Sequence, residues 1–229
     1  MLTVPDRLER VAHRGSPRAR PENTLPGFLL ALEHGADAVE LDAHVTRDGV
    51  AVVHHDDSVA GVPIAGVRWP DLADVDLGRG ARIPRLSDVL TAVGDRARVY
   101  VELKGRNIEN VVIDVVRRHG HEFALHSFDH AAIARVAAKA PDMPTGVLLD
   151  KGTHSPVAEL VRIVEETKPH PRDVWPHWSL VNTQFVRAAH QHDMRVVVWT
   201  VNSAEVARGL STLHVDGVCT DDLTIFANL

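Results

Sequence analysis

Acidic and basic side chains in the first half of this chain are spaced as groups that could act together on one substrate. Glu40 and Asp42 lie two residues apart in the run Ala38–Val45, in which apolar and polar side chains alternate. Alternation with a period of two predicts a β-strand that turns both carboxylates and His44 toward one face. Carboxylates held so close repel one another and lose hydration when buried, so they need a cation or a hydrogen-bonding cage. A hard divalent metal ion is the expected partner, because Mg²⁺ and Ca²⁺ prefer oxygen ligands.

Further reactive groups lie where other apolar runs end. A second alternating run, 99–104, turns Glu102 and Lys104 toward a shared face, and His13 with Arg14 closes the first apolar run. Such a set suits a phosphate ester, because cations bind phosphoryl oxygens, a metal offsets developing charge and imidazoles transfer protons at neutral pH.

Simpler roles remain open at this stage. Glu40 and Asp42 could form a salt-bridged polar layer, and Glu102 could merely pair with Lys104. His54 and His55 alternate in direction, so at most one is expected to enter the site.

Two other segments also have a simple interpretation. Pro21–Thr24 predicts a helix start, with Asn23 or Thr24 as N-cap, although a helix N-terminus could also help to hold an anion. Trp199 is grouped with the substrate-binding residues as an apolar wall, and Ser127 is a weak nucleophile candidate because it lacks a Gly-x-Ser-x-Gly elbow.

Strand-like and helix-like segments alternate along the whole chain. This alternation predicts a parallel sheet, and about eight such units match a (β/α)₈ TIM barrel, with an open doubly wound sheet as the competitor. The carboxyl ends of barrel strands would gather the reactive groups at one rim. The expected strands are 11–15, 38–45, 50–55, 99–104, 123–128, 145–149, 174–178, 195–201 and 217–220, and the expected helices are 24–34, 87–93, 108–119, 131–140, 156–166, 183–191 and 204–210.

The alternation breaks once, at about residues 56–83, where Gly, Pro and Asp are frequent. A segment this long after the second strand is typical of a binding loop. We therefore expect a single barrel domain over residues 1–229 with one short insertion. Val59, Val62, Ile64, Val67 and Trp69 could give it an apolar path to the rim or could simply anchor it.

Composition indicates which partners and which cellular compartment to expect. The chain of 229 residues has 25 Lys and Arg against 31 Asp and Glu, a formal net charge of −6, and it has no basic tract, so nucleic acid is not expected. Its single cysteine fits a reducing compartment, and neither a secretion signal nor a membrane-spanning segment is evident. A cytoplasmic protein with a small-molecule partner is expected, and its oligomeric state stays open.

The motifs together resemble the glycerophosphodiester phosphodiesterase family. Nine blocks in family order, from residue 11 to about 222, carry the resemblance. They are Ala12–Gly15, Pro21–Thr24 leading to Gly27 and Phe28, Gly35–Asp42, Thr46–Gly49, Val52–Asp56, Ile83–Leu86, Val101–Gly105, Trp199–Asn202 and Val215–Asp221.

This resemblance implies a (β/α)₈ barrel that hydrolyses glycerophosphodiesters to glycerol 3-phosphate and an alcohol with a divalent cation, Mg²⁺ or Ca²⁺. On the matching positions Glu40, Asp42 and Glu102 would be the metal ligands. His13 and His55 would be the acid–base pair. Arg14 and Lys104 would hold the phosphate, and Glu22 would support the site near the metal.

The chain departs from the family pattern in the insertion, which is short and has Ser58–Gly61 where the family has Arg-Thr. A reduced cover leaves substrate choice open. A lysophospholipase D-like phosphodiesterase is therefore the alternative enzyme, and a non-catalytic phosphate- or polyol-binding barrel is the alternative of another class. The alcohol moiety, the metal, the base of the histidine pair, and a water or cyclic-phosphate route are also left open.

Overall fold

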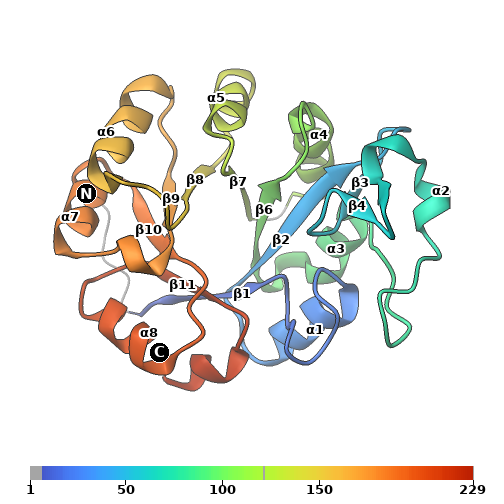
Figure 1. Cartoon of the computed structure of the whole chain (residues 1–229), viewed down its shortest axis with the longest axis horizontal. Helices are drawn as coiled ribbons and strands as arrows, with labels where there is room; N and C mark the ends of the chain where they lie inside the picture. Colours follow the sequence, from blue (N-terminus) through green and yellow to red (C-terminus); the bar gives the residue numbers. More distant parts are fainter. Residues whose placement is uncertain (1–6, 121, 229) are drawn as a thin grey trace. The chain divides into compact units, whose positions relative to one another are not determined.

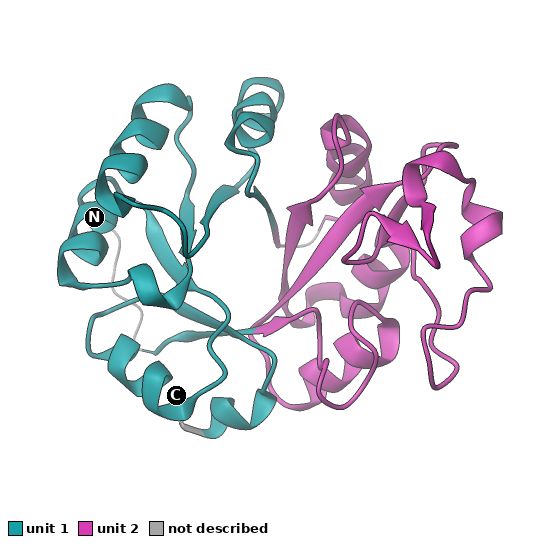
Figure 2. Cartoon of the chain, viewed as in Figure 1, with its two compact units in different colours: residues 1–11, 124–229 teal, residues 12–123 magenta. Residues whose placement is uncertain are grey.

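The computed structural model describes residues 7–120 and 122–228. Contacts divide the chain into two compact units, unit 1 (residues 1–11 and 124–229) and unit 2 (residues 12–123), which Figure 2 shows in teal and magenta. Each unit has its own strands and covering helices. The single domain expected over residues 1–229 stays a prediction.

Unit 2 is built on two parallel strands. β2 (Ala38–Val45) pairs with β6 (Arg98–Leu103) in a register that sets Asp42 beside Glu102. The short strand β3 (Ala51–Val53) runs antiparallel to β2, and β1 (Glu9–His13) ends in this unit. The covering helices are α1 (Leu25–Glu33), α3 (Leu86–Val93) with the 3₁₀ turn η2 (Gly94–Arg96), and α4 (Glu109–His119).

The helices of unit 2 pack through apolar stripes. In α3 the buried residues are Leu86, Val89, Leu90 and Val93, which recur every three or four positions and so share one face. α3 lies between α1 and α4 and contacts both. Val39, Leu41 and their neighbours fill the opposite side of β2, which leaves its other face to the polar residues.

The insertion forms a small apolar cluster of its own. It contains β4 (Ser58–Val59), β5 (Val62–Pro63), the 3₁₀ turn η1 (Ile64–Gly66) and α2 (Trp69–Leu72), to the right in Figure 1. Its cluster consists of Val52, Val59, Ile64, Leu72 and Ile83, with Val67 and Trp69 packed against it. These residues anchor the insertion and do not form the apolar path considered above. Of that set, Val62 is exposed, at 47%.

Unit 1 repeats the strand–helix alternation. Its strands pair in parallel in the order β7 (Phe123–Ser127), β8 (Thr145–Leu149), β9 (Asp173–Pro176), β10 (Arg195–Val198) and β11 (Gly217–Thr220). The helical elements are α5 (His130–Lys139), α6 (Pro156–Glu166), η3 (Trp178–Leu180), α7 (Thr183–Gln191), α8 (Ala204–Ser211) and η4 (Leu223–Asn228).

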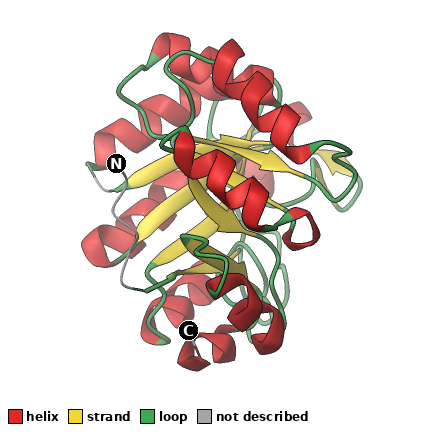
Figure 3. Ribbon diagram, turned by 90° about the vertical axis from the view of Figure 1, so that its left-hand side faces the viewer, coloured by secondary structure: helices red, strands yellow, loops and turns green. Residues whose placement is uncertain are grey.

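The element order is that of a (β/α)₈ barrel. β1, β6, β7, β8, β9, β10 and β11 are each followed by a helical element. β2 is followed by β3 and then by the insertion with β4 and β5, before the helix α3. Figure 3 shows strands in yellow and helices in red along them. The fold predicted from the alternation of segments is therefore confirmed, and the doubly wound alternative is not.

Most expected boundaries agree with the structure to within one or two residues. The first strand, expected over residues 11–15, covers Glu9–His13 and ends there because Arg14 and Gly15 adopt positive φ angles of 52° and 86°. Such angles cannot continue a β-strand. The expected strand 195–201 ends at Val198, after which Trp199 makes only an isolated bridge.

Within the described ranges, no helix has the length and apolar character needed to cross a membrane.

Candidate active site

Three buried carboxylates meet on the polar face of β2 and β6. Oxygen atoms of Glu40, Asp42 and Glu102 all lie within 4.8 Å of one another. Their residues are 3%, 0% and 6% exposed. The parallel register brings Asp42 beside Glu102, and Glu40 lies two residues before Asp42 on the same strand face. Among the residues that the structure describes, this is the one group of acidic, histidine or cysteine side chains placed to share an ion.

Arg14 contacts the cluster from the loop after β1. Its Nε lies 3.0 Å from Asp42 Oδ2, its Nη1 lies 3.2 Å from Glu22 Oε2, and its backbone N–H donates to Glu40 Oε2 at 3.3 Å. Burial lowers the pKa of the guanidinium, but attraction to Asp42, Glu40 and Glu22 outweighs burial and raises the pKa overall. Arg14 therefore stays charged.

Lys104 is the second cation at the cluster. Its Nζ lies 3.2 Å from Glu102 Oε1 and 3.6 Å from Asp42 Oδ1. The pairing of Glu102 with Lys104 that was considered from the sequence is present, but the same ammonium also faces Asp42 and so belongs to the cluster.

Formal charges at the site do not cancel. Among the described residues, four carboxylates, those of the cluster and Glu22, face the cations Arg14 and Lys104, which leaves −4 + 2 = −2 with His13 counted as neutral. Asp42 Oδ1 is also buried without a hydrogen-bond partner. A buried acceptor of this kind is costly unless something binds it. The excess charge and the open oxygen match what a divalent cation needs, so the cluster could bind a metal ion.

The conformation of the loop after β1 explains how Arg14 reaches the cluster. Arg14 and Gly15 both have positive φ angles, so the chain turns sharply where the strand ends. A Cβ at position 15 would lie 2.7 Å from the backbone carbon of Gly27, at the start of α1. Only glycine fits this approach, which is the physical reason for Gly15 after His13 and Arg14.

The two histidines predicted to transfer protons have different surroundings. His13 Nε2 lies 3.8 Å from Glu40 Oε2, so the structure places His13 against the acidic cluster. His55 follows β3, and its Nδ1 donates to Asp56 Oδ1 at 2.8 Å. That bond lowers the pKa of Asp56. In the neutral imidazole it also leaves Nε2 of His55 as the open nitrogen.

Two neighbouring imidazoles, those of His44 and His54, are affected by burial. Burial lowers the pKa of both His44 and His54, while nearby carboxylates, Asp42 among them, act in the opposite direction. His44 Nε2 donates to the carbonyl of His55 at 3.3 Å, so His44 ties the turn that carries His55 to β2. The carboxylates of Glu22 and Asp42 act to raise the pKa of His54, although the alternation of directions lets at most one of His54 and His55 enter the site.

Asn23 is a site residue that the sequence did not indicate. The segment was expected to cap a helix through Asn23 or Thr24. Thr24 is the N-cap residue of α1, but its side chain makes no capping hydrogen bond. Asn23 instead turns its fully buried amide toward Asp42. No sequence signal separates this role from capping, because both use Asn before a helix.

Trp199 lies in unit 1, in an aromatic cluster with Phe128 and His177. Its indole N–H donates to the carbonyl of Trp175 at 2.8 Å, which fixes the ring. Ser127, the weak nucleophile candidate, is buried, and its hydroxyl oxygen accepts from the backbone N–H of Asp129. The role of Trp199 as a substrate wall stays a prediction.

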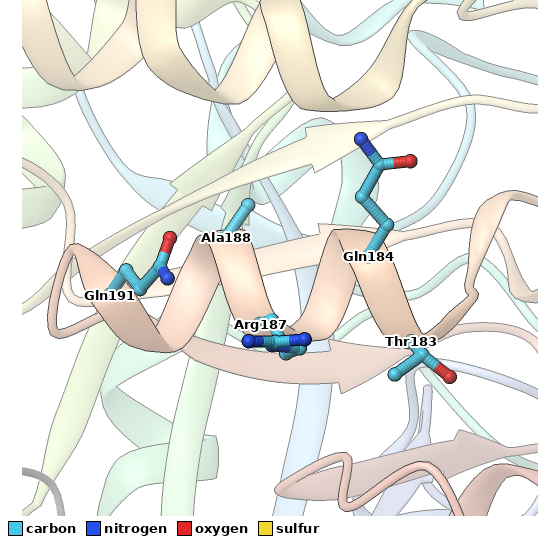
Figure 4. Close-up of a pocket in the computed structure, with 5 residues that line it drawn as sticks. All are labelled: Thr183, Gln184, Arg187, Ala188 and Gln191. Atoms are coloured by element: carbon cyan, nitrogen blue, oxygen red, sulfur yellow. The ribbon is translucent and has the colours of Figure 1, made fainter.

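A depression of about 450 Å³ in unit 1 has no comparable chemistry. It is lined by side chains of α7 alone, namely Thr183, Gln184, Arg187, Ala188 and Gln191, as Figure 4 shows. One cation and two amides along a single helix provide neither an acid–base pair nor a metal ligand set.

Fold and acidic cluster together define a (β/α)₈ barrel protein with a cation-competent site on the strands of unit 2. The model of the glycerophosphoryl diester phosphodiesterase family matches residues 13–225. The chain belongs to this family of enzymes, as its motifs indicated.

Relatives and solved structures agree with this assignment. A probable glycerophosphodiester phosphodiesterase 2 of Mycobacterium tuberculosis is 32% identical over 92% of this chain and 86% of its own length. A glycerophosphodiester phosphodiesterase of Caldanaerobacter subterraneus is 29% identical over 96% of both chains. The crystal structure of a glycerophosphodiester phosphodiesterase from Thermotoga maritima, 26% identical, covers 96% of this chain and 97% of its own with a TM-score of 0.83.

A further structure has the same fold and a bound product. An Oleispira antarctica phosphodiesterase in complex with sn-glycerol-3-phosphate gives a TM-score of 0.85 at 23% identity, and it covers 96% of both chains. At that identity the likeness establishes the fold alone.

Proposed function

We propose that the protein hydrolyses glycerophosphodiesters to glycerol 3-phosphate and an alcohol, with a divalent cation held by Glu40, Asp42 and Glu102. Family membership supports the phosphodiesterase activity. The observation that carries the metal requirement is the excess of buried carboxylates over cations on β2 and β6. An acceptor oxygen of Asp42 left open inside this cluster supports it further.

Glu40, Asp42 and Glu102 would hold the cation, which would supply positive charge that offsets the charge of the phosphate. Arg14 and Lys104 hold the remaining phosphoryl oxygens, Arg14 through its planar fork and Lys104 as a point charge. Glu22, which is 45% exposed at its side chain, keeps the Arg14 guanidinium oriented through Nη1. The raised pKa of Arg14 ensures that this positive charge is present across the working pH range.

Proton transfer is assigned to His13 and His55. One imidazole accepts the proton of the attacking hydroxyl or water as the new P–O bond forms. The other protonates the alkoxide oxygen as the bond to the leaving alcohol breaks. Asp56 holds Nδ1–H of His55, so His55 exchanges its proton at Nε2. His13 lies against Glu40, with 3.8 Å between its Nε2 and Oε2 of Glu40.

A panel of substrates and metals tests the function. Release of the alcohol would be measured from glycerophosphocholine, glycerophosphoethanolamine and a long-chain lysophosphatidylcholine with Mg²⁺, Ca²⁺, Mn²⁺ or EDTA. The other product is glycerol 3-phosphate from the first two substrates and lysophosphatidic acid from the third. The proposal expects turnover of the first two substrates with at least one cation and none in EDTA. Binding of phosphodiesters without turnover under any condition would indicate a binding protein and overturn the assignment.

The neighbouring histidines provide a matched pair of variants. His55→Ala should reduce kcat by at least about a hundredfold, the low end for loss of a general acid or base. His54→Gln keeps a polar side chain of similar size and should change kcat at least about tenfold less, because the hydrogen bond to Asp56 belongs to His55. Near-normal turnover by His55→Ala would remove His55 from the mechanism.

A further inference from the structure

The side-chain amide of Asn23 holds one residue of the acidic cluster by two bonds. Its Nδ2 donates to Asp42 Oδ2 at 2.8 Å, and its Oδ1 accepts from the backbone N–H of Asp42 at 3.3 Å. Both residues are fully buried. The amide therefore fixes the carboxylate and the backbone of Asp42 together.

Asn23 is itself held in place by the chain around it. Its φ angle is 57°, a left-handed conformation that Asn adopts more readily than most residues. Its backbone N–H donates to the carbonyl of Arg14 at 3.0 Å. The amide thus links the loop that carries Arg14 to the strand that carries Asp42.

The two oxygens of Asp42 consequently have different surroundings. Oδ2 accepts from Asn23 and also lies 3.0 Å from Nε of Arg14. Oδ1 is buried without a hydrogen-bond partner, and Lys104 Nζ lies 3.6 Å from it. With Oδ2 engaged, Oδ1 is the oxygen that remains for a metal ion.

We propose that Asn23 is a positioning residue that holds the Asp42 carboxylate so that Asp42 binds the cation through Oδ1 alone. This inference rests on the metal site of the proposed function. Binding through one oxygen implies a preference for Mg²⁺ over Ca²⁺. Carboxylates that each give one oxygen fit the octahedral coordination of Mg²⁺, whereas Ca²⁺ also accepts both oxygens of one carboxylate. An Asp42 carboxylate released from Asn23 can rotate and offer both oxygens.

A purely structural role for Asn23 makes a different prediction. If the amide only ties the loop to β2, its loss lowers the stability of the protein but leaves the affinity for each cation unchanged. Groups that orient a metal ligand typically contribute about 10- to 100-fold to metal affinity. Metal affinity, measured without substrate, therefore separates the two roles.

The test uses Asn23→Gly, which removes both hydrogen bonds and tolerates the positive φ angle. Thr24→Val is the matched control, because it removes a buried hydroxyl in the same loop that donates to the carbonyl of Pro21 at 2.6 Å and not to Asp42. Dissociation constants for Mg²⁺ and Ca²⁺ would be measured by titration calorimetry on the full chain. Unfolding in EDTA would report the stability of each variant.

We expect Asn23→Gly to weaken Mg²⁺ binding by about tenfold or more and to weaken Ca²⁺ binding less, with Thr24→Val unchanged for both. Asn23→Ser, whose hydroxyl is too short to make both bonds, replaces it if the glycine variant does not fold. Unchanged Mg²⁺ affinity, or an equal loss for both cations, overturns the positioning role even if turnover falls. Wild-type protein that binds neither cation overturns the metal site and the proposed function with it.

Discussion

We predict that Lys104→Met lowers the free energy of unfolding of the cation-free protein by about 3 kcal/mol and makes its stability depend more strongly on a divalent cation. Lys104 is the side chain that faces Glu102 and Asp42 at once, at 3.2 Å and 3.6 Å. Methionine keeps most of the apolar stem and removes only the charge. The effect therefore reports on the charge balance of the acidic cluster.

The magnitude follows from the distances. At an effective dielectric constant of about 20, each of the two contacts of Lys104 attracts by about 5 kcal/mol, and each pair of carboxylate oxygens at 4.8 Å repels by about 3.5 kcal/mol. Desolvation of the ammonium offsets much of the gross attraction, and removal of one partner of a buried ion pair costs about 3–5 kcal/mol in practice. The Lys104 side chain is 21% exposed, which places the expected loss near the lower end.

The assay is urea unfolding at neutral pH, once in EDTA and once in saturating Mg²⁺. A bound cation replaces part of the lost positive charge, so the deficit of the variant should shrink in Mg²⁺. Stabilisation by a ligand equals RT ln(1 + [L]/Kd), so a larger gain in Mg²⁺ means tighter binding by the variant. Turnover should fall all the same, since Lys104 is proposed to hold the phosphate.

Lys151→Met is the control, because Lys151 is an exposed lysine in unit 1 and its loss should change stability by less than about 0.5 kcal/mol. Equal deficits for Lys104→Met in EDTA and in Mg²⁺ would refute the reasoning. So would a variant as stable as the wild type, because uncompensated carboxylates could not then share the site.

Two further outcomes follow from the local geometry. Gly15→Ala should lower the free energy of unfolding, measured in a thermal melt, by about 2 kcal/mol or more. The φ angle of Gly15 is 86°, and a Cβ there would lie 2.7 Å from the backbone of Gly27. Gly61→Ala is the control for the φ angle alone, because Gly61 has a φ angle of 80° and open space around it. Burial lowers the pKa of His54 in the folded protein below its value in the unfolded chain. As the pH falls, the unfolded chain therefore binds a proton at His54 before the folded protein does, and the free energy of unfolding should decrease below about pH 6.5. His54→Gln should flatten that dependence relative to the exposed control His154→Gln, and an unchanged slope would contradict it.

The acidic cluster could be predicted from the sequence because each step is local. Alternation along residues 38–45 and 99–104 sets the direction of every side chain, and parallel pairing of consecutive strands sets their common edge. The register that places Asp42 beside Glu102 comes from packing between strands, which one sequence does not specify. A slip by one residue would turn Glu102 to the face opposite Glu40 and Asp42, so the cluster depends on this register.

The loops that complete the site could not be predicted in the same way. Arg14 and Asn23 both adopt left-handed φ angles, and the direction of a side chain after such a residue depends on the turn as a whole. Asn23 was therefore interpreted as a helix cap. The insertion was also ambiguous, because Ile64 and its apolar neighbours fit both a substrate path and the small cluster that they form.

The cation-free contacts of Arg14 bear on how the site would accept a substrate. Its guanidinium is already held by Asp42 and Glu22, so a phosphate that binds Arg14 must compete with carboxylates. A cation on the acidic cluster weakens that competition, because it takes over the charge of Asp42. The metal would then act before any chemistry, by freeing Arg14 for the phosphate while Asn23 keeps the position of Asp42 unchanged. Binding of cation and phosphodiester should accordingly be cooperative, with coupling that passes through the carboxylate shared by Arg14 and the metal.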